Sequence, residues 1–441
     1  MMYLKPSTAV YVVYANIALY CLCYMMQQPV LPYRTKQLGA SNAEFAQFQS
    51  LFNLVQSVGG LLSGPVMDAL GGRMLLLISF MASALCYSMT ASATSLLMLY
   101  LSRVPTLLQH AVLAARTIVT SASAASDRAK HLGYVGVCTG IGMTAGPMIG
   151  GYLSEVSLEF VSWIATAGSF FSLLTVLLLV PPPDAPSKKG SSSNSDYNVP
   201  KDEKRESSHN INGTAASSES SNKSVTSDKN GKSSANIVSG GDGSRTRRVL
   251  ILGHFWEVLV SPGVSSLMTL KIITTLASTL FQSMFTVVLQ NQGQGPKYAG
   301  NAMSFLGMTS ILSQAFLVAP AIQHLGESRT IYIGCWGLLG GFILLALAKG
   351  ATMTVVSLIP QSLAGVLISA VSTSKLTKAV SKERLGTALA IDMGVWSAVR
   401  MVTPSMGAWL LEHGGSSGIG SLSAALMVVL LGSMHLGMVD C

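Results

Sequence analysis

Apolar residues occur along the chain in long stretches separated by short polar connections. Six stretches precede a long polar segment and six follow it: 8–32, 44–70, 74–93, 95–119, 132–153 and 159–181, then 264–290, 299–324, 330–348, 353–375, 386–410 and 416–438. About 20 apolar residues suffice for a helix to cross a bilayer, and lipid satisfies no backbone polar group of an isolated strand. The pattern predicts an all-α membrane protein with twelve transmembrane helices.

The two groups of stretches predict two six-helix bundles, residues 1–181 and 249–441, joined by a linker over 182–248. The linker is rich in Ser, Asn, Gly and Lys and has almost no large apolar residues, so we expect it to be disordered. Its two glycosylation sequons, at Asn212 and Asn222, would go unused in the cytosol. The short apolar run 249–260 predicts an interfacial helix that opens the second bundle, with a buried strand as the alternative.

Basic residues in the short connections are biased to one side of the predicted topology. With the N-terminus inside, that side holds Lys5, Arg73, Arg128, Lys130, Arg329, Lys375, Lys378, Lys382 and Arg384, whereas the other side holds Arg34, Lys36, Lys297 and Lys349. Because cytoplasmic loops carry the excess of Lys and Arg, we expect both termini and the linker in the cytosol. The membrane is expected to be the plasma membrane or an internal, vacuolar or endosomal, one.

Composition excludes a soluble enzyme. The chain is 49% hydrophobic and 11% charged, whereas soluble domains carry about a quarter charged residues. We find no phosphate-binding loop, no metal-ligand spacing among the six cysteines and no nucleophile with an arranged base. We therefore expect no enzymatic activity, no cofactor and no metal. The net charge of +9 lies largely in the loops, which does not indicate a nucleic-acid partner.

The two halves repeat each other in short motifs. Asp127-Arg128 and Glu383-Arg384 each precede a glycine at the start of an apolar stretch, and Pro147 and Gly150 recur as Pro404 and Gly407. Such repeats are typical of secondary transporters, whose substrate site lies between the halves.

Two motifs indicate a family. The connection 64–73 carries Gly64, Asp68, Gly71 and Arg73 at the spacing of the loop motif of major facilitator transporters, although Ala69 and Gly72 replace two of its basic residues. The stretch 142–151, with Gly142, Gly146, Pro147, Gly150 and Gly151, resembles the Gly-Pro motif of the drug:proton antiporter branch. The resemblance implies the major facilitator fold, two pseudo-symmetric six-helix bundles that work by alternating access.

Each motif also has a physical reason. Glycines four residues apart let a partner helix approach closely, and Pro147 kinks or stiffens its helix. Asp68 near a helix N-terminus is favoured by the helix dipole, and its pairing with Arg73 would lock a gate. We treat the following residues as gating motifs: Gly64, Asp68, Gly71, Arg73, Arg128, Gly142, Gly146, Pro147, Gly150, Gly151, Arg384, Pro404 and Gly407.

Ionisable residues inside the apolar stretches are the main candidates for binding or coupling. Each is expensive in a bilayer unless it is paired or hydrated. The candidate set, with three polar neighbours, is Arg103, His110, Lys271, Gln282, Asp392, Arg400, Asn53 and Gln56. Arg103 is similar to the arginine of the family's fourth-span motif. Arg103 also supports a resemblance to organic-cation-transporter-like solute carriers, together with His110, Lys271 and Arg400.

Each candidate has a structural alternative. Arg103 and Arg400 could form buried ion pairs, Lys271 could extend to the interface, and the neutral His110 could pack without carrying protons. Asn53, Gln56 and Gln282 could bridge helices. Asp392 must pair with Arg400 or Lys271 or take up a proton, so it is either a static partner or a proton carrier.

These features predict an alternating-access carrier of small organic solutes. The resemblance implies proton-coupled transport of an organic cation or drug. However, Arg103, Lys271 and Arg400 outnumber Asp392, which suits an anionic or zwitterionic metabolite. A non-transporting scaffold whose linker recruits partners is the alternative of another class. We expect a monomer whose partners are a small-molecule substrate, protons and the lipid bilayer.

Overall fold

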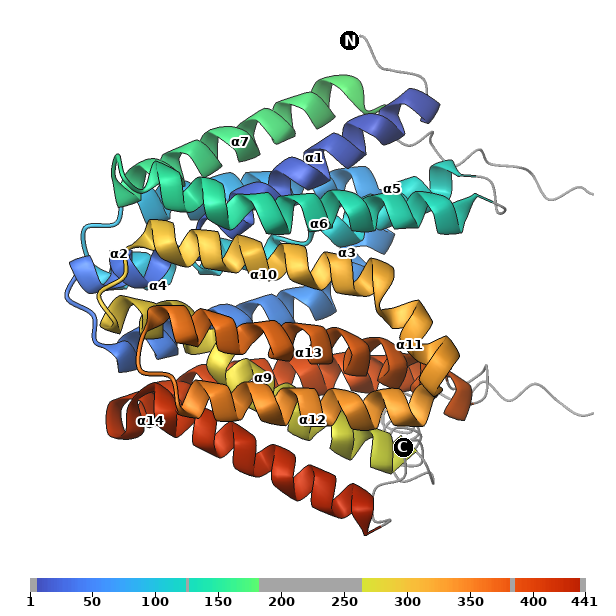
Figure 1. Cartoon of the computed structure of the whole chain (residues 1–441). Coiled ribbons are helices and arrows are strands. Elements are labelled where there is room, and N and C mark those ends of the chain that lie inside the picture. Colours follow the sequence, from blue (N-terminus) through green and yellow to red (C-terminus); the bar gives the residue numbers. More distant parts are fainter. Residues whose placement is uncertain (1–5, 124–126, 182–263, 381–384, 437–441) are drawn as a thin grey trace, which may run out of the picture. The chain divides into compact units, whose positions relative to one another are not determined.

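The computed structural model of the chain describes residues 6–123, 127–181, 264–380 and 385–436 (Figure 1). Every regular element in these ranges is a helix. The predicted linker, the apolar run 249–260 and the gating candidate Arg384 lie outside the described residues.

The helices fall into two sequential groups. The first comprises α1 (Pro6–Met26), α2 (Leu31–Gln37), α3 (Asn42–Ala91), α4 (Leu96–Leu101), the 3₁₀ helix η1 (Val104–Leu108), α5 (Ala111–Ala122), α6 (Arg128–Leu153) and α7 (Leu158–Leu179). The second comprises α9 (Val264–Asn291), α10 (Pro296–Phe316), α11 (Val318–Leu325), α12 (Glu327–Ala346), α13 (Ala351–Ala379) and α14 (Leu385–His435).

The described helices account for the twelve predicted spans. Nine continuous or nearly continuous helical segments are long and apolar enough to cross a membrane, and α10 with α11, bent by 44°, forms a further span. The two longest, α3 and α14, each hold two of the predicted apolar stretches. The prediction of an all-α protein with twelve transmembrane helices is therefore confirmed.

Glycines with positive φ make the turns within the long elements. Gly71 in α3 has φ 81° and ψ 159°, and Gly415 in α14 has φ 60° and ψ −160°, conformations that favour glycine because a Cβ would be strained there. Gly326, between α11 and α12, has φ 77° and ψ 166°. Gly71 and Gly326 thus form the same turn at equivalent places in the two halves, so the internal repeat extends to the backbone.

The first span is shorter than the predicted stretch 8–32. Helix α1 ends at Met26, and the chain continues through a tight turn into the short helix α2. Arg34 of α2 is 8% exposed, donates to the Ala93 carbonyl at 2.7 Å and pairs with Glu159 at the start of α7. A basic residue expected in a short connection thus holds three elements of the first bundle together.

The two bundles meet at one end of the helices, which we call the closed end. It carries the turns 92–95, 154–157, 292–295 and 347–350. Phe45, Phe48 and Leu99 of the first bundle belong there to one buried apolar cluster with Leu280 and Phe281 of the second. The opposite end, which carries Gly71 and Gly326, is called the open end.

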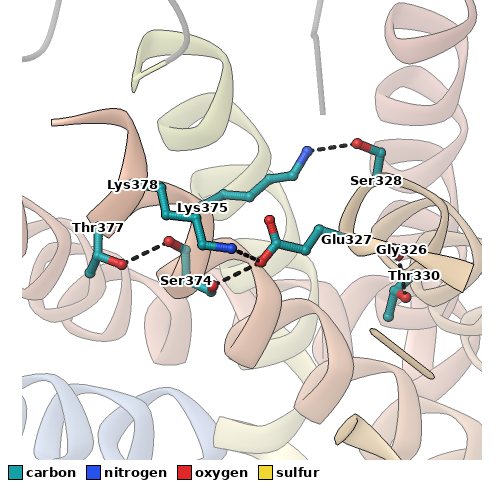
Figure 2. A network of polar contacts seen from close by, with 8 residues as sticks. All are labelled: Gly326, Glu327, Ser328, Thr330, Ser374, Lys375, Thr377 and Lys378. Atoms are coloured by element: carbon teal, nitrogen blue, oxygen red, sulfur yellow. Dashed lines mark hydrogen bonds and ion pairs between the residues drawn. The ribbon is translucent and has the colours of Figure 1, made fainter. Parts of the chain in front are cut away.

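At the open end a polar network ties α12 to α13 (Figure 2). The Glu327 carboxylate accepts hydrogen bonds from Lys378 Nζ at 2.7 Å and from Ser374 Oγ at 2.9 Å. Lys375 Nζ donates to Ser328 Oγ at 2.7 Å. Because Glu327 directly follows Gly326, the network fixes the turn between the second and third spans of the second bundle.

Candidate functional site

A cavity of about 290 Å³ lies between the two bundles. Helices α1, α3, α6 and α14 and the broken fourth span supply its walls. The lining residues are Tyr20, Cys21, Tyr24, Phe52, Asn53, Gln56, Ser57, Gln109, Val112, Met143, Trp396, Ser397 and Arg400. Three predicted candidates, Asn53, Gln56 and Arg400, are thus brought together, and none of the described residues in the lining is acidic.

Helix α14 presents a cation and an aromatic ring to this cavity. Trp396 and Arg400 are four residues apart and so share a helix face. The Arg400 guanidinium lies 4.4 Å from the centre of the Trp396 ring, which is cation–π geometry. Asn53 Nδ2 of α3 donates to the Arg400 carbonyl at 2.7 Å. The Asn53 amide therefore bridges the two bundles beside the cavity.

The fourth span is broken where it reaches the cavity. The chain leaves α4, passes through η1 with Pro105 at its start, and resumes a helix only at Ala111. Side chains of neighbouring helices donate hydrogen bonds to the backbone carbonyls that the break leaves without α-helical partners. Gln56 donates to the Thr106 carbonyl at 3.3 Å, Ser79 to the Leu108 carbonyl at 3.0 Å and Tyr20 to the Gln109 carbonyl at 3.1 Å. Irregular backbone is tolerated at membrane depth only when it is satisfied in this way or lines a cavity.

His110 lies at the end of this break, next to α3. A Cβ at Gly59 would come within 2.0 Å of the Leu107 carbonyl oxygen and 2.6 Å of His110 Nε2. Only glycine lets α3 approach the broken span so closely. His110 Nε2 itself is buried without a hydrogen-bond partner among the described residues, and His110 is not among the cavity's lining residues.

Arg103 is buried toward the closed end rather than in the main cavity. It is 4% exposed, donates to Thr90 Oγ1 and Ser102 Oγ, and lies 4.9 Å from the centre of the Phe48 ring. It borders a second cavity of about 10 Å³, which has room for about one water molecule. Tyr24, Phe52 and Gln109 line both cavities, so Arg103 lies directly behind the wall of the main one.

Lys271 and Asp392 form an ion pair outside the cavity lining. Lys271 Nζ of α9 lies 2.7 Å from Asp392 Oδ2 of α14 and 3.1 Å from Thr373 Oγ1 of α13. Of the two partners considered for Asp392, the structure selects Lys271 rather than Arg400. The ammonium is bound within the bundle, so Lys271 does not extend freely to the interface. Gln282, also on α9, is exposed and lies outside the cavity.

The glycines of the α6 motif pack against two different helices, α1 and α10. A Cβ at Gly142, Gly146 or Gly150 would lie within 2.8 Å of α1 atoms, down to 2.2 Å from the Met26 carbonyl oxygen for Gly150. A Cβ at Gly151 would instead lie 2.9 Å from Lys297 Cα of α10, in the other bundle. The Pro147 carbonyl also faces α10, 2.3 Å from a Cβ at Gly300. One face therefore packs the first bundle and the other joins the bundles.

Of the remaining motif residues, Pro404 and Gly407 lie on the closed-end half of α14 and the others lie toward the open end. Gly407 packs on α9, where a Cβ would lie 2.8 Å from Met284 Cγ, and Pro404 is buried one turn before it. Asp68 and Arg128 are exposed, and a Cβ at Gly64 would meet nothing within 4 Å. Arg73 donates to the Leu177 and Val180 carbonyls at the end of α7, at 3.1 and 2.8 Å. The Asp68–Arg73 gate contact stays a prediction.

Sequence reasoning missed the aromatic wall of the cavity. Tyr20 and Tyr24 on α1, Phe52 on α3 and Trp396 on α14 line it. A usable signal was present, since Tyr20 with Tyr24 and Trp396 with Arg400 each stand four residues apart on one helix face. Gln109 had no such signal, because it lies where the fourth span is not helical.

The sequence pattern of the Major Facilitator Superfamily matches residues 13–263 and 267–437, and the chain belongs to this superfamily. The chain is 26% identical to solute carrier family 22 member 18 of Mus musculus over 439 residues, 95% of this chain and 92% of that protein. It is also 26% identical to the class G tetracycline resistance protein of Vibrio anguillarum over 367 residues, 81% of this chain and 79% of that protein.

Solved structures show the same fold. The nucleoside transporter NupG superposes with a TM-score of 0.68 at 14% identity, over 96% of this chain and 98% of that one. The resemblance to major facilitator transporters and to a solute carrier branch is confirmed. The chain is a multi-pass integral membrane protein of the transporter type and not an enzyme.

Proposed function

We propose that the chain carries a small, amphipathic organic solute through the cavity at Arg400 and Trp396 by alternating access. The observation that carries the proposal is the cavity's place between the bundles. Both bundles contribute to its wall, so a rocking of one bundle against the other must remodel it. Aromatic rings, three amide side chains and one guanidinium line it, the mix of apolar surface and few polar groups typical of small-molecule sites.

The contacts at the closed end support a state that is shut on that side. Tyr33 Oη donates to the Gln294 carbonyl at 2.6 Å, Lys297 Nζ to Glu155 Oε1 at 2.8 Å, and the Met148 amide to Ser304 Oγ at 2.9 Å. Each bond joins one bundle to the other. Burial raises the pKa of Tyr33 to about 12, so its hydroxyl stays protonated and able to donate. These bonds must break for the cavity to open at this end.

The bias of basic residues supports an orientation for the two ends. Arg73, Arg128, Lys375 and Lys378 all lie toward the open end. By the positive-inside rule that end faces the cytosol, and the closed end faces the other side of the membrane.

The pair Lys271–Asp392 is the proposed coupling element. A carboxylate inside a span is stable while an ammonium neutralises it and takes up a proton more readily once that partner moves away. The pair joins α9 to α14 within the second bundle, so coupling requires these two helices to move apart during the transport cycle. Protonation of Asp392 would then accompany solute movement.

The test is solute counterflow into proteoliposomes that hold the purified full chain. A panel of labelled aromatic anions, zwitterions and cations should include solutes that enter faster than into protein-free liposomes. A variant that lacks 185–245 should transport at the same rate, because the cavity lies outside the linker. If no solute crosses, or if deletion of the linker alone abolishes function, the scaffold alternative replaces the carrier.

A further inference from the structure

The main cavity contains a cation that pairs with no carboxylate among the described residues. The ion pairs among the described residues are Arg34–Glu159, Lys271–Asp392, Lys297–Glu155 and Lys378–Glu327. The Arg400 guanidinium takes part in none of them and contacts the Trp396 ring instead. The acid nearest to it along α14, Asp392, is engaged by Lys271. A half-buried guanidinium therefore faces an acid-free lining.

A second cation adds to the positive potential of this cavity. Arg103, behind the shared wall, is held by two hydroxyl groups and an aromatic ring. These hydroxyl groups accept hydrogen bonds from Nε and Nη2 of Arg103 but do not cancel its charge. At 4% exposure water screens that charge poorly. Both guanidinium groups lie within electrostatic range of the Tyr24 hydroxyl, which borders the two cavities.

The shape and polarity of the lining restrict the solute further. Tyr20, Tyr24, Phe52 and Trp396 offer aromatic surface, which suits a flat apolar body. The fork of donors in a guanidinium matches the two oxygens of a carboxylate. Asn53 holds the backbone of Arg400 from the other bundle, so the charged end of the solute would bind where the two bundles meet.

We propose that the solute is an organic anion with a planar aromatic body, whose negative group binds Arg400 while its ring packs against the aromatic wall. The assignment names the substrate class of the carrier function proposed above and rests on it. A cationic solute would meet two uncompensated guanidinium groups and no acid in the lining. Neutralisation of Arg400 by the bound anion would also lower the free energy of closing the cavity around the solute.

The test measures binding rather than transport. The full-length protein, purified in detergent, is titrated with 2-naphthoate, 2-naphthamide and 2-naphthylmethylammonium, which share a ring system and differ in charge. Binding raises the unfolding temperature by mass action. We expect naphthoate to bind about tenfold to a hundredfold more tightly than the amide, the effect of a hydrogen bond to a charged group. The ammonium compound should not stabilise the protein.

Variants locate the effect. Arg400→Gln should remove the preference for naphthoate over naphthamide, and Arg400→Lys should keep part of it. The unfolding temperature of each variant without probe shows whether it is folded. Lys349→Gln removes an exposed cation outside the cavity and should leave the preference unchanged. Tighter binding of the ammonium compound, no binding of naphthoate at millimolar concentration, or an unchanged preference in folded Arg400→Gln would overturn the assignment.

Binding and transport can fail separately. If naphthoate binds with the expected preference but no solute crosses proteoliposomes, the carrier proposal fails and the anion site stands. If solutes cross but cations are preferred, the carrier proposal stands and the anion assignment fails.

Discussion

The ammonium of Lys271 in α9 lies 2.7 Å from the carboxylate of Asp392 in α14, although 121 residues separate them. Their side chains are 11% and 24% exposed. The pair brings together two charges that would each be expensive in an apolar span. It leaves Arg400, two turns along α14, without that acid.

Substitution of Asp392 separates proton coupling from a static role. Under coupling, Asp392→Asn should fold and exchange solute between the two sides, but its transport should no longer respond to a pH gradient. Under a static role, the variant should be less stable because Lys271 is left unpaired, and residual transport should keep its pH response. The measurement is solute flux with and without an imposed pH gradient.

The double variant Lys271→Met with Asp392→Asn is the matched control. It removes both charges, so it should recover stability that the single variant loses. A well-folded Asp392→Asn protein whose flux still follows the pH gradient would rule out Asp392 as the proton carrier.

Two adjacent glycines should behave differently on substitution by alanine. Gly150→Ala places a Cβ 2.2 Å from a backbone oxygen of α1, so the first bundle should lose stability by about 1–3 kcal/mol or more. Gly151→Ala places its Cβ 2.9 Å from Lys297 Cα, so it should instead push the bundles apart at the closed end. Unfolding temperature should fall mainly in the first variant.

A reporter cysteine measures the second effect. Gln28 lines the second cavity, which the contacts at the closed end cover. A membrane-impermeant thiol reagent should therefore label Gln28→Cys faster when Gly151 is replaced by alanine. Equal labelling with Gly151 and with alanine would show that this face of α6 does not hold the closed end shut.

Removal of the Tyr33 hydroxyl should weaken the closed end without disturbing either bundle. Tyr33→Phe deletes one hydrogen bond to Gln294, a contribution of roughly 1 kcal/mol or about a fivefold change in an equilibrium. Labelling of the same reporter should rise by a comparable factor. Tyr332→Phe serves as the control, because Tyr332 lies on α12 toward the open end, and it should leave the labelling unchanged. No increase with Tyr33→Phe would contradict the proposed role of the closed end.

The orientation of the chain can be tested with protease. We expect both termini and residues 182–248 in the cytosol, because basic residues collect at the open end. Protease added outside sealed, right-side-out vesicles should leave the linker intact and should cut it after the vesicles are opened. Cleavage in sealed vesicles would reverse the topology.

The spans were predictable because crossing a bilayer requires a long apolar stretch, whatever packs beside it. The ends of the spans were less predictable. Helix α1 stops at Met26 because Pro29 and Pro32 follow within the apolar stretch. The break in the fourth span was also hidden, since the stretch 95–119 reads as continuous. Only the fold shows that Gln56, Ser79 and Tyr20 satisfy its carbonyls.

The candidate site was predicted in kind but not in arrangement. The cost of burying charge singled out Arg103, Lys271, Asp392 and Arg400. Sequence spacing relates residues on one helix and cannot select partners on another, so it left the choice between Lys271 and Arg400 open. Gln282 was a candidate because it is a polar residue within a predicted span. It is exposed on α9 and does not line the cavity.

Exchange of labelled 2-naphthoate across proteoliposome membranes tests the central claim, that the Arg400 cavity is the site through which an organic anion crosses. Liposomes loaded with unlabelled naphthoate should take up the label with the wild-type chain and with Lys349→Gln. Uptake should be reduced with Arg400→Lys and fall by about tenfold or more with Arg400→Gln. Wild-type exchange by a folded Arg400→Gln protein, or faster exchange of the naphthylmethylammonium cation, would contradict the account.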